Sequence, residues 1–156
     1  MQLTRAADYA VRVMVHLATL PERERALLPA LAGATGAPES FLSKVMQALS
    51  RAKLIKSRRG YAGGFEILPL GREASMLEVI EAIDGPIFLN VCLISGTSCA
   101  REANCPAHPV WIKAQTAMMD VLSGALIAEM ASQAIARQAR AQRVIDLVQP
   151  IEPVAQ

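Results

Sequence analysis

Three cysteines and a histidine lie close together in one short stretch of the chain. Cys92, Cys99, Cys105 and His108 follow the pattern C-x6-C-x5-C-x2-H, and the sequence has no other cysteine. An odd number of cysteines, without a signal-peptide layout in residues 1–20, argues against structural disulfides. Thiolates on an irregular loop can be deprotonated and oriented together around a soft metal. The pattern therefore predicts a metal or cluster site.

The spacing alone leaves the chemistry of this site open. Zinc and an iron–sulfur cluster both accept thiolate together with imidazole, but the paired C-x2-C knuckles typical of zinc are missing. The wider gaps favour a loop that surrounds a larger inorganic core. A metal-free thiol switch, in which two of the cysteines form a disulfide on oxidation, is the alternative.

The distribution of charge predicts a nucleic-acid partner. Residues 1–72 contain 11 basic and 5 acidic residues, a net charge of +6, whereas residues 73–156 contain 5 basic and 9 acidic residues, a net charge of −4. Five cations fall within nine residues that include no acid: Arg51, Lys53, Lys56, Arg58 and Arg59. Such a run is also found on ordinary solvated surfaces, so the secondary-structure elements around it must show whether it binds nucleic acid.

Two short helices joined by a glycine turn precede these cations. Thr4 is a candidate N-cap for a first helix, Pro29 suits the first turn of a second helix, and Gly36 ends that helix. A third helix opens at Glu39 or Ser40 and repeats apolar residues at helical spacing. Its other face carries side chains that can bind base edges or phosphates: Ser40, Ser43, Lys44, Gln47 and Arg51. This arrangement predicts a helix-turn-helix.

A β-hairpin is expected directly after the third helix. Residues 54–58 form a candidate strand, 59–64 a glycine-rich turn and 65–68 a returning strand. A hairpin here is the wing of a winged helix-turn-helix, and its guanidinium groups suit a narrow minor groove. The expected contacts with DNA are Arg58, Arg59, Gly60 and Tyr61.

The remaining elements predict a dimer. Ser75 and Glu78 form a capping-box pattern for a further helix that Gly85 closes. The apolar stripe that begins at Trp111 continues in helical spacing towards residue 148. A small domain cannot bury so long an apolar stripe, so we expect a second copy of the chain to pack against it. The alternative is a helix folded back on its own domain.

We therefore expect a mainly α-helical fold with a small β-hairpin wing and a long dimerisation helix. Residues 1–85 form the winged helix-turn-helix, 86–109 the cysteine loop, 110–148 the dimerisation helix and 149–156 a flexible tail. No apolar run reaches the roughly 20 residues of a membrane span, and we expect a cytoplasmic protein. Neither histidine stands beside a serine or cysteine nucleophile in a recognisable motif, so no enzyme is predicted.

The motifs together resemble those of the Rrf-type winged-helix regulators, whose members include the IscR, NsrR and RirA groups. The resemblance is carried by MQLTRAADYAV, the ESFLSKVMQALSRAKLI recognition segment, the RRGYAGGF wing and the CPAHPVW run, and it covers nearly all of residues 1–135. It implies a homodimer that binds a partly palindromic site in double-stranded promoter DNA, with Cys92, Cys99 and Cys105 as ligands of an iron–sulfur cluster.

The resemblance leaves two candidates for the fourth ligand. In the IscR-like arrangement a histidine three positions after the last cysteine, here His108, completes a [2Fe-2S] site. In the NsrR-like arrangement an acidic residue on the first helix of the partner subunit, here Asp8, completes a [4Fe-4S] site. The six-residue gap between Cys92 and Cys99 departs from the five-residue gap usual in both groups.

The expected function is a cluster-dependent transcriptional repressor that senses redox state, nitric oxide or iron. Cluster binding would order residues 91–108 and set the spacing of the two recognition helices, so that affinity for DNA depends on cluster state. The thiol switch is the first alternative. A small iron–sulfur electron carrier is the second, and the basic hairpin argues against it.

Overall fold

The computed structural model describes residues 3–60, 63–94, 99 and 104–148 of the 156-residue chain. The helices and strands follow one another as α1 (Arg5–Thr19), α2 (Leu28–Thr35), α3 (Glu39–Arg51), β1 (Ile55–Arg58), β2 (Gly64–Ile67), α4 (Pro69–Glu73), α5 (Met76–Asp84), the 3-10 helix η1 (Val91–Leu93), α6 (His108–Gly124) and α7 (Ile127–Val148). The predicted tail, residues 149–156, lies outside the described residues.

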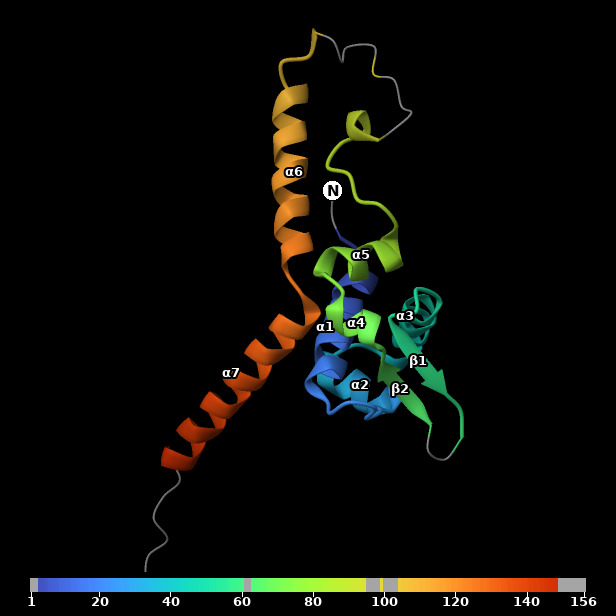
Figure 1. Ribbon diagram of the computed structural model, residues 1–156, viewed down its shortest axis with the longest axis vertical. Helices are drawn as coiled ribbons and strands as arrows, with labels where there is room; N and C mark the ends of the chain where they lie inside the picture. The colour runs from blue at the N-terminus through green and yellow to red at the C-terminus, as the bar shows by residue number, and fades with distance from the viewer. Residues whose placement is uncertain (1–2, 61–62, 95–98, 100–103, 149–156) are drawn as a thin grey trace, which may run out of the picture.

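Helix α1 lies at the centre of the molecule (Figure 1). Thr4 caps it as predicted, because its hydroxyl accepts a hydrogen bond from the Ala7 amide at 3.2 Å. Its apolar side chains are buried on more than one side, and α2, α3, α5 and α7 all pack against it. The α1 residues in the two core clusters are Ala7, Ala10, Val13, Met14, Leu17 and Ala18.

The helix-turn-helix is confirmed. Helix α2 ends at Gly36, whose left-handed backbone (φ 70°) turns the chain towards α3 without the steric cost that a side chain would bring. Helix α3 buries one apolar face against α1, formed by Leu42, Val45, Met46 and Leu49. Its polar face is left outside the core.

The two-stranded wing forms within one residue of the predicted bounds. Strands β1 and β2 are antiparallel, with Ile55 opposite Ile67 and Arg58 opposite Gly64. Pairing of Ala26 with Phe65 adds an isolated bridge on the other edge of β2. The short helix α4 was not anticipated; it begins at Pro69, a residue suited to a first helical turn.

The capping box at the start of α5 is confirmed. The Ser75 hydroxyl accepts from the Glu78 amide at 3.2 Å, and the Glu78 carboxylate accepts from the Ser75 amide at 2.7 Å. The Ser75 amide and the Ser75 hydroxyl, the latter at 2.8 Å, both donate to the Glu78 carboxylate, which favours its ionised form and holds the pKa of Glu78 below its ordinary value. Helix α5 therefore begins where the sequence places it.

The long C-terminal helix is not continuous, which corrects the prediction of one helix over residues 110–148. Helix α6 ends at Gly124 and α7 begins at Ile127. Between them the Ala125 carbonyl accepts from the Met76 amide at 2.8 Å, and the Ile127 amide donates to the Ala74 carbonyl at 2.9 Å. These backbone groups pair with Ala74 and Met76 at the start of α5 instead of continuing the helical hydrogen bonds, so the chain bends.

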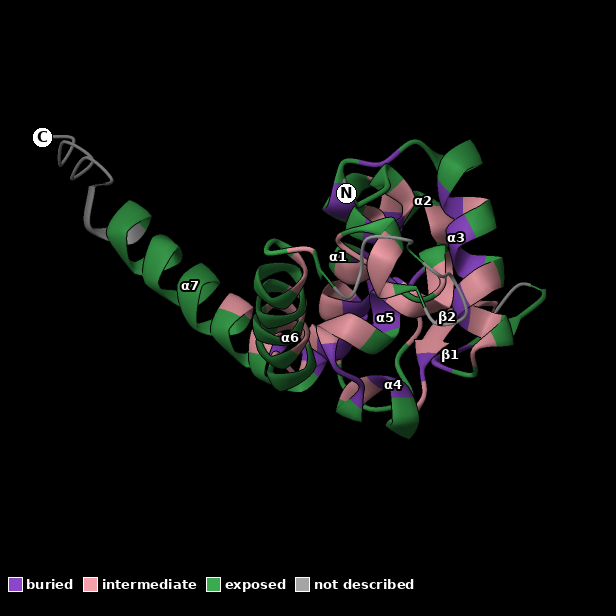
Figure 2. Cartoon of the chain, turned by 90° about the horizontal axis from the view of Figure 1, so that it is seen from above, coloured by how far each residue is buried: buried purple, intermediate pink, exposed green. Residues whose placement is uncertain are grey.

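The first turns of α7 belong to the core of the winged helix-turn-helix. Ile127 is 0% and Ala131 2% exposed, and both lie in the main apolar cluster with residues of α1 and α3. The alternative in which the last helix folds back on its own domain is therefore correct for these turns. Further along, α7 is mostly exposed, and α6 has no buried residue (Figure 2).

None of the helices in the described ranges combines the length and the hydropathy that a membrane span requires.

The close approach of α4 to Leu54, the residue before β1, predicts a strongly destabilising substitution. A methyl group on Gly71 would overlap the Leu54 backbone carbonyl and lie 2.9 Å from the Met14 side chain. We expect Gly71→Ala to lower the free energy of unfolding by about 2 to 3 kcal/mol, measured by urea denaturation, because overpacking against backbone cannot relax.

Gly33→Ala is the matched control. Gly33 lies in α2 with nothing within 4 Å of the added methyl group, so this change should leave stability equal or raise it by up to about 1 kcal/mol. Equal stabilities of the two variants would contradict the packing described for α4.

Candidate functional site

The exposed face of α3 carries the residues expected to bind DNA. Ser40, Lys44, Gln47 and Arg51 are exposed, and Ser43 is half-buried. The Ser43 hydroxyl donates to the Glu39 carbonyl at 3.2 Å, which leaves its oxygen able to accept from a ligand. The structure therefore gathers all five predicted polar residues of this helix on its outer side.

A groove of about 500 Å³ separates α3 from the wing. The Ser50 hydroxyl oxygen is buried at this groove and has no hydrogen-bond partner within the described part of the chain. Polar and cationic groups from both elements line the groove, with Met46 and Phe65 as its apolar members. The polar lining residues are Ser43, Gln47, Ser50, Arg51, Ser57 and Arg59.

The two wing arginines, which were predicted to act together, lie on different faces of the hairpin. Arg59 lines the groove beside α3 with Ser57. Arg58 lines a separate hollow of about 190 Å³, together with Arg25, Lys56 and Glu66. Alternation along β1 places Lys56 and Arg58 on one face and Ser57 on the other. Only Arg59 therefore shares a surface with the recognition helix.

The predicted glycine at the wing tip has the backbone that the turn requires. Gly60 has φ 103°, a conformation that favours glycine. Gly64 has φ 125°, and a side chain there would lie 2.8 Å from the Ala26 carbonyl. Tyr61, the other candidate at the tip, lies outside the described residues.

Asp8 is held in an ion pair on the surface of α1. Its carboxylate lies 2.7 Å from the Arg12 guanidinium, which also donates to the Thr35 carbonyl at 3.3 Å. Arg12 lies over the ring of Tyr9, 5.8 Å from its centroid, and Tyr9 meets Phe41 edge to face at 5.6 Å. A continuous set of contacts thus joins Asp8 to the recognition helix.

The three cysteines are free thiols in the structure. Cys92 in η1 and Cys105 before α6 are half-buried, and Cys99 is exposed. His108 opens α6 and is half-buried, with Nδ1 inaccessible to solvent. Across the described ranges, no three histidine, cysteine, aspartate or glutamate side chains converge as metal ligands.

The structure therefore supplies the donors of a cluster site without bringing them together. Three thiols and an imidazole are the right chemistry for an iron–sulfur cluster, so the donor set fits. To hold a cluster, Cys92, Cys99 and Cys105 would have to approach one another, and the Asp8 carboxylate is engaged by Arg12.

Gln115 of α6 fastens the start of the cysteine loop, and sequence analysis missed it. Its side-chain nitrogen donates to the Ile87 carbonyl at 2.8 Å, and its side-chain oxygen accepts from the Leu89 amide at 2.8 Å. The sequence does contain a sign of this clamp. Gln115 lies in the apolar stripe between Trp111 and Met118, where a polar side chain needs a hydrogen-bond partner.

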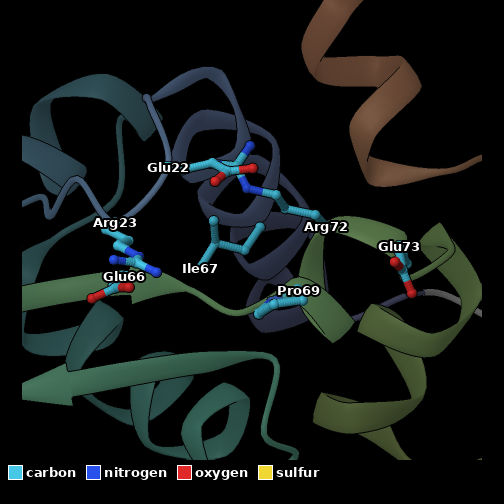
Figure 3. Close-up of a pocket in the computed structure, with 7 residues that line it drawn as sticks. All are labelled: Glu22, Arg23, Glu66, Ile67, Pro69, Arg72 and Glu73. Carbon is cyan, nitrogen blue, oxygen red and sulfur yellow. The ribbon is translucent and has the colours of Figure 1, made fainter.

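A further hollow of about 330 Å³ lies between the loop after α1, the end of β2 and α4 (Figure 3). Its lining mixes carboxylates and guanidinium groups: Glu22, Arg23, Glu66, Ile67, Pro69, Arg72 and Glu73. Arg72 donates to the Ala18 and Leu20 carbonyls at 2.9 and 2.8 Å, so it fixes the end of α1. Arg72 therefore has a structural role in this hollow, and the hollow shares no lining residue with the groove beside α3 and includes none of the cysteines.

The chain is similar to known transcriptional regulators. The Rrf2 family model, described as "Iron-dependent Transcriptional regulator", matches residues 3–133. A Mycobacterium tuberculosis protein described as an HTH-type transcriptional regulator is 32% identical over 135 residues, which cover 86% of this chain and 84% of that protein. The HTH-type transcriptional regulator IscR of Vibrio vulnificus is 26% identical over 132 residues, which cover 85% and 78%.

A solved structure shares the fold. The oxidized form of Staphylococcus aureus CymR superposes with a TM-score of 0.66 at 23% identity and covers 84% of this chain and 96% of that one. The winged helix-turn-helix observed here is therefore a known architecture, and the resemblance seen in the sequence motifs is confirmed. The chain belongs to the Rrf2 family of transcriptional regulators.

Proposed function

We propose that the protein is a homodimeric DNA-binding repressor whose affinity for its promoter site is set by the state of its cysteine loop. The observation that carries the proposal is the groove of about 500 Å³ between α3 and the wing, lined by hydroxyl, amide and guanidinium groups. Such groups hold the sugar–phosphate backbone while neighbouring side chains read base edges.

Helix α3 is the element that enters the major groove. Ser40, Ser43, Lys44 and Gln47 face outward and provide donors and acceptors for base edges. The DNA strand that borders the major groove then lies between α3 and the hairpin, where Arg51 and Arg59 meet its phosphates. The wing reaches the adjacent minor groove.

A second copy of the chain covers the exposed apolar side chains of α6 and α7. Helix α6 buries no side chain, and Val121 is 71% exposed. The other exposed large apolar residues of these helices are Val110, Trp111, Ile112, Ile135, Val144 and Ile145. A two-fold dimer along these helices presents two recognition helices, which fits a partly palindromic site.

An iron–sulfur cluster on Cys92, Cys99 and Cys105 is the proposed sensor. The free thiols fit this group, and a curated relative carries the name IscR. We favour His108 over Asp8 as fourth ligand, because Asp8 is already paired with Arg12. When bound, the cluster supplies a centre that is sensitive to redox state, nitric oxide or iron supply.

A metal-free thiol switch is the second candidate. The structure holds three separate thiols, one of them exposed, and a protein of the same fold was solved in an oxidized form. In this version two thiols lose two electrons and two protons to hydrogen peroxide, so that one disulfide and two waters are formed. Absorption spectra distinguish the two candidates.

Protein purified without oxygen should be coloured. We expect visible absorption from iron–sulfur charge transfer in the wild type, and its loss in Cys92→Ser because one thiolate ligand is removed. His16→Ala is the control, since His16 lies on α1 away from the loop. Colourless wild-type protein that still binds promoter DNA would overturn the cluster and leave the thiol switch.

Arg59 should contribute directly to DNA binding. Replacing Arg59 with Ala removes one cation from the groove of each subunit, two per dimer, so the slope of log K against log salt should fall in magnitude by about 1.8. Fluorescence anisotropy with a labelled duplex from upstream of the protein's own gene measures this slope. Arg140→Ala, an exposed cation on α7, is the control. Identical slopes for both variants would remove the wing from the interface.

Gln115 should couple the cysteine loop to α6. Gln115→Met removes both hydrogen bonds to the segment before Cys92, so the Leu89 amide should exchange with solvent at least tenfold faster, as measured by nuclear magnetic resonance. Gln133→Met, on the exposed part of α7, should leave this exchange unchanged. Unchanged protection of Leu89 in the Gln115 variant would show that the segment is held by other contacts.

A further inference from the structure

The outer face of the wing, turned away from α3, carries an ordered row of charges. Strand β1 places Lys56 opposite Glu66 of β2. On the other edge of β2, Ala26 pairs with Phe65, which brings the preceding Arg25 alongside Glu66. The Arg25 and Glu66 side chains meet at 3.3 Å. Arg25, Glu66 and Lys56 therefore form one cross-strand row.

The next cross-strand pair on this face, Arg58 and Gly64, leaves an open hollow. Arg58 stands opposite Gly64, and glycine has no side chain to fill the space beside it. The resulting hollow of about 190 Å³ is lined by Arg25, Lys56, Arg58 and Glu66. Glu66 neutralises only one of the three cations, so the hollow has a net charge of +2.

We propose that this hollow, defined here as the outer wing site, binds a backbone phosphate of the DNA strand on the far side of the minor groove. The inference rests on the proposed function. If the near strand lies in the groove between α3 and the wing, the hairpin stands at the minor groove, which is only about 6 Å wide. Its other face then meets the second strand bordering that groove.

The charge pattern suits this partner. Single phosphates along a strand are recognised by clustered lysine and arginine donors that position the protein without reading bases. Glu66 keeps Arg25 in place through the ion pair, while Lys56 and Arg58 are exposed and able to reach a phosphate. The wing thereby contacts both strands: Arg59 binds the near strand, and the outer wing site binds the far strand.

The test is the double variant Lys56→Ala/Arg58→Ala, compared with the wild type on the duplex from upstream of the protein's own gene. The dimer loses one far-strand phosphate contact in each subunit, so the slope of log K against log salt should fall in magnitude by about 1.8. The ratio of the affinities at 50 and 200 mM salt should therefore fall about twelvefold. Phosphate-ethylation interference should disappear on the far strand of the minor groove and persist on the near strand, where Arg59→Ala has its effect.

Two further variants separate charge from structure. Lys56→Arg/Arg58→Lys keeps both cations and should retain the far-strand interference. Lys113→Ala/Arg140→Ala removes two exposed cations from α6 and α7 and should leave the ethylation pattern unchanged. A double wing variant with wild-type slope and wild-type interference on both strands overturns the outer wing site while DNA binding stands. A wild type that binds no duplex overturns the proposed function itself.

Discussion

The packing of α1 is the constraint on which the rest of the structure depends. Towards its end α1 buries Val13 and Leu17 in the cluster that holds the recognition helix. Near its start, Ala7 is fully buried with Ile87 and the side of α6 that faces the domain. One helix therefore contacts both the helix-turn-helix and the segment leading to the cysteines, so the two regions share a packing partner.

Local patterns explain why much of the fold was predictable. Caps at Thr4 and Ser75, the turn at Gly36 and the hairpin glycines act within a few residues, so the helix-turn-helix, the wing and α5 were placed nearly to the residue. The bend at residues 125–126 was missed, because backbone pairing with the segment around Ser75 is a contact between distant parts of the chain.

The candidate site was predictable in composition but not in arrangement. The polar face of α3 follows from helical periodicity, but the separation of Arg58 from Arg59 depends on which hairpin face packs beside α3. Likewise, the cysteine pattern identified the donors, whereas the clamp by Gln115 and the ion pair that occupies Asp8 arise from tertiary contacts. The proposed regulation therefore rests on tertiary contacts that residue spacing does not encode.

The central claim is that the state of the cysteine loop sets affinity for DNA through α1. The most direct measurement is the dissociation constant for the upstream duplex, determined without oxygen on one preparation before and after removal of bound iron, at fixed salt. We predict a change of at least tenfold, which corresponds to about 1.4 kcal/mol between the two states. Equal dissociation constants, with the protein dimeric and folded in both states, would contradict the account.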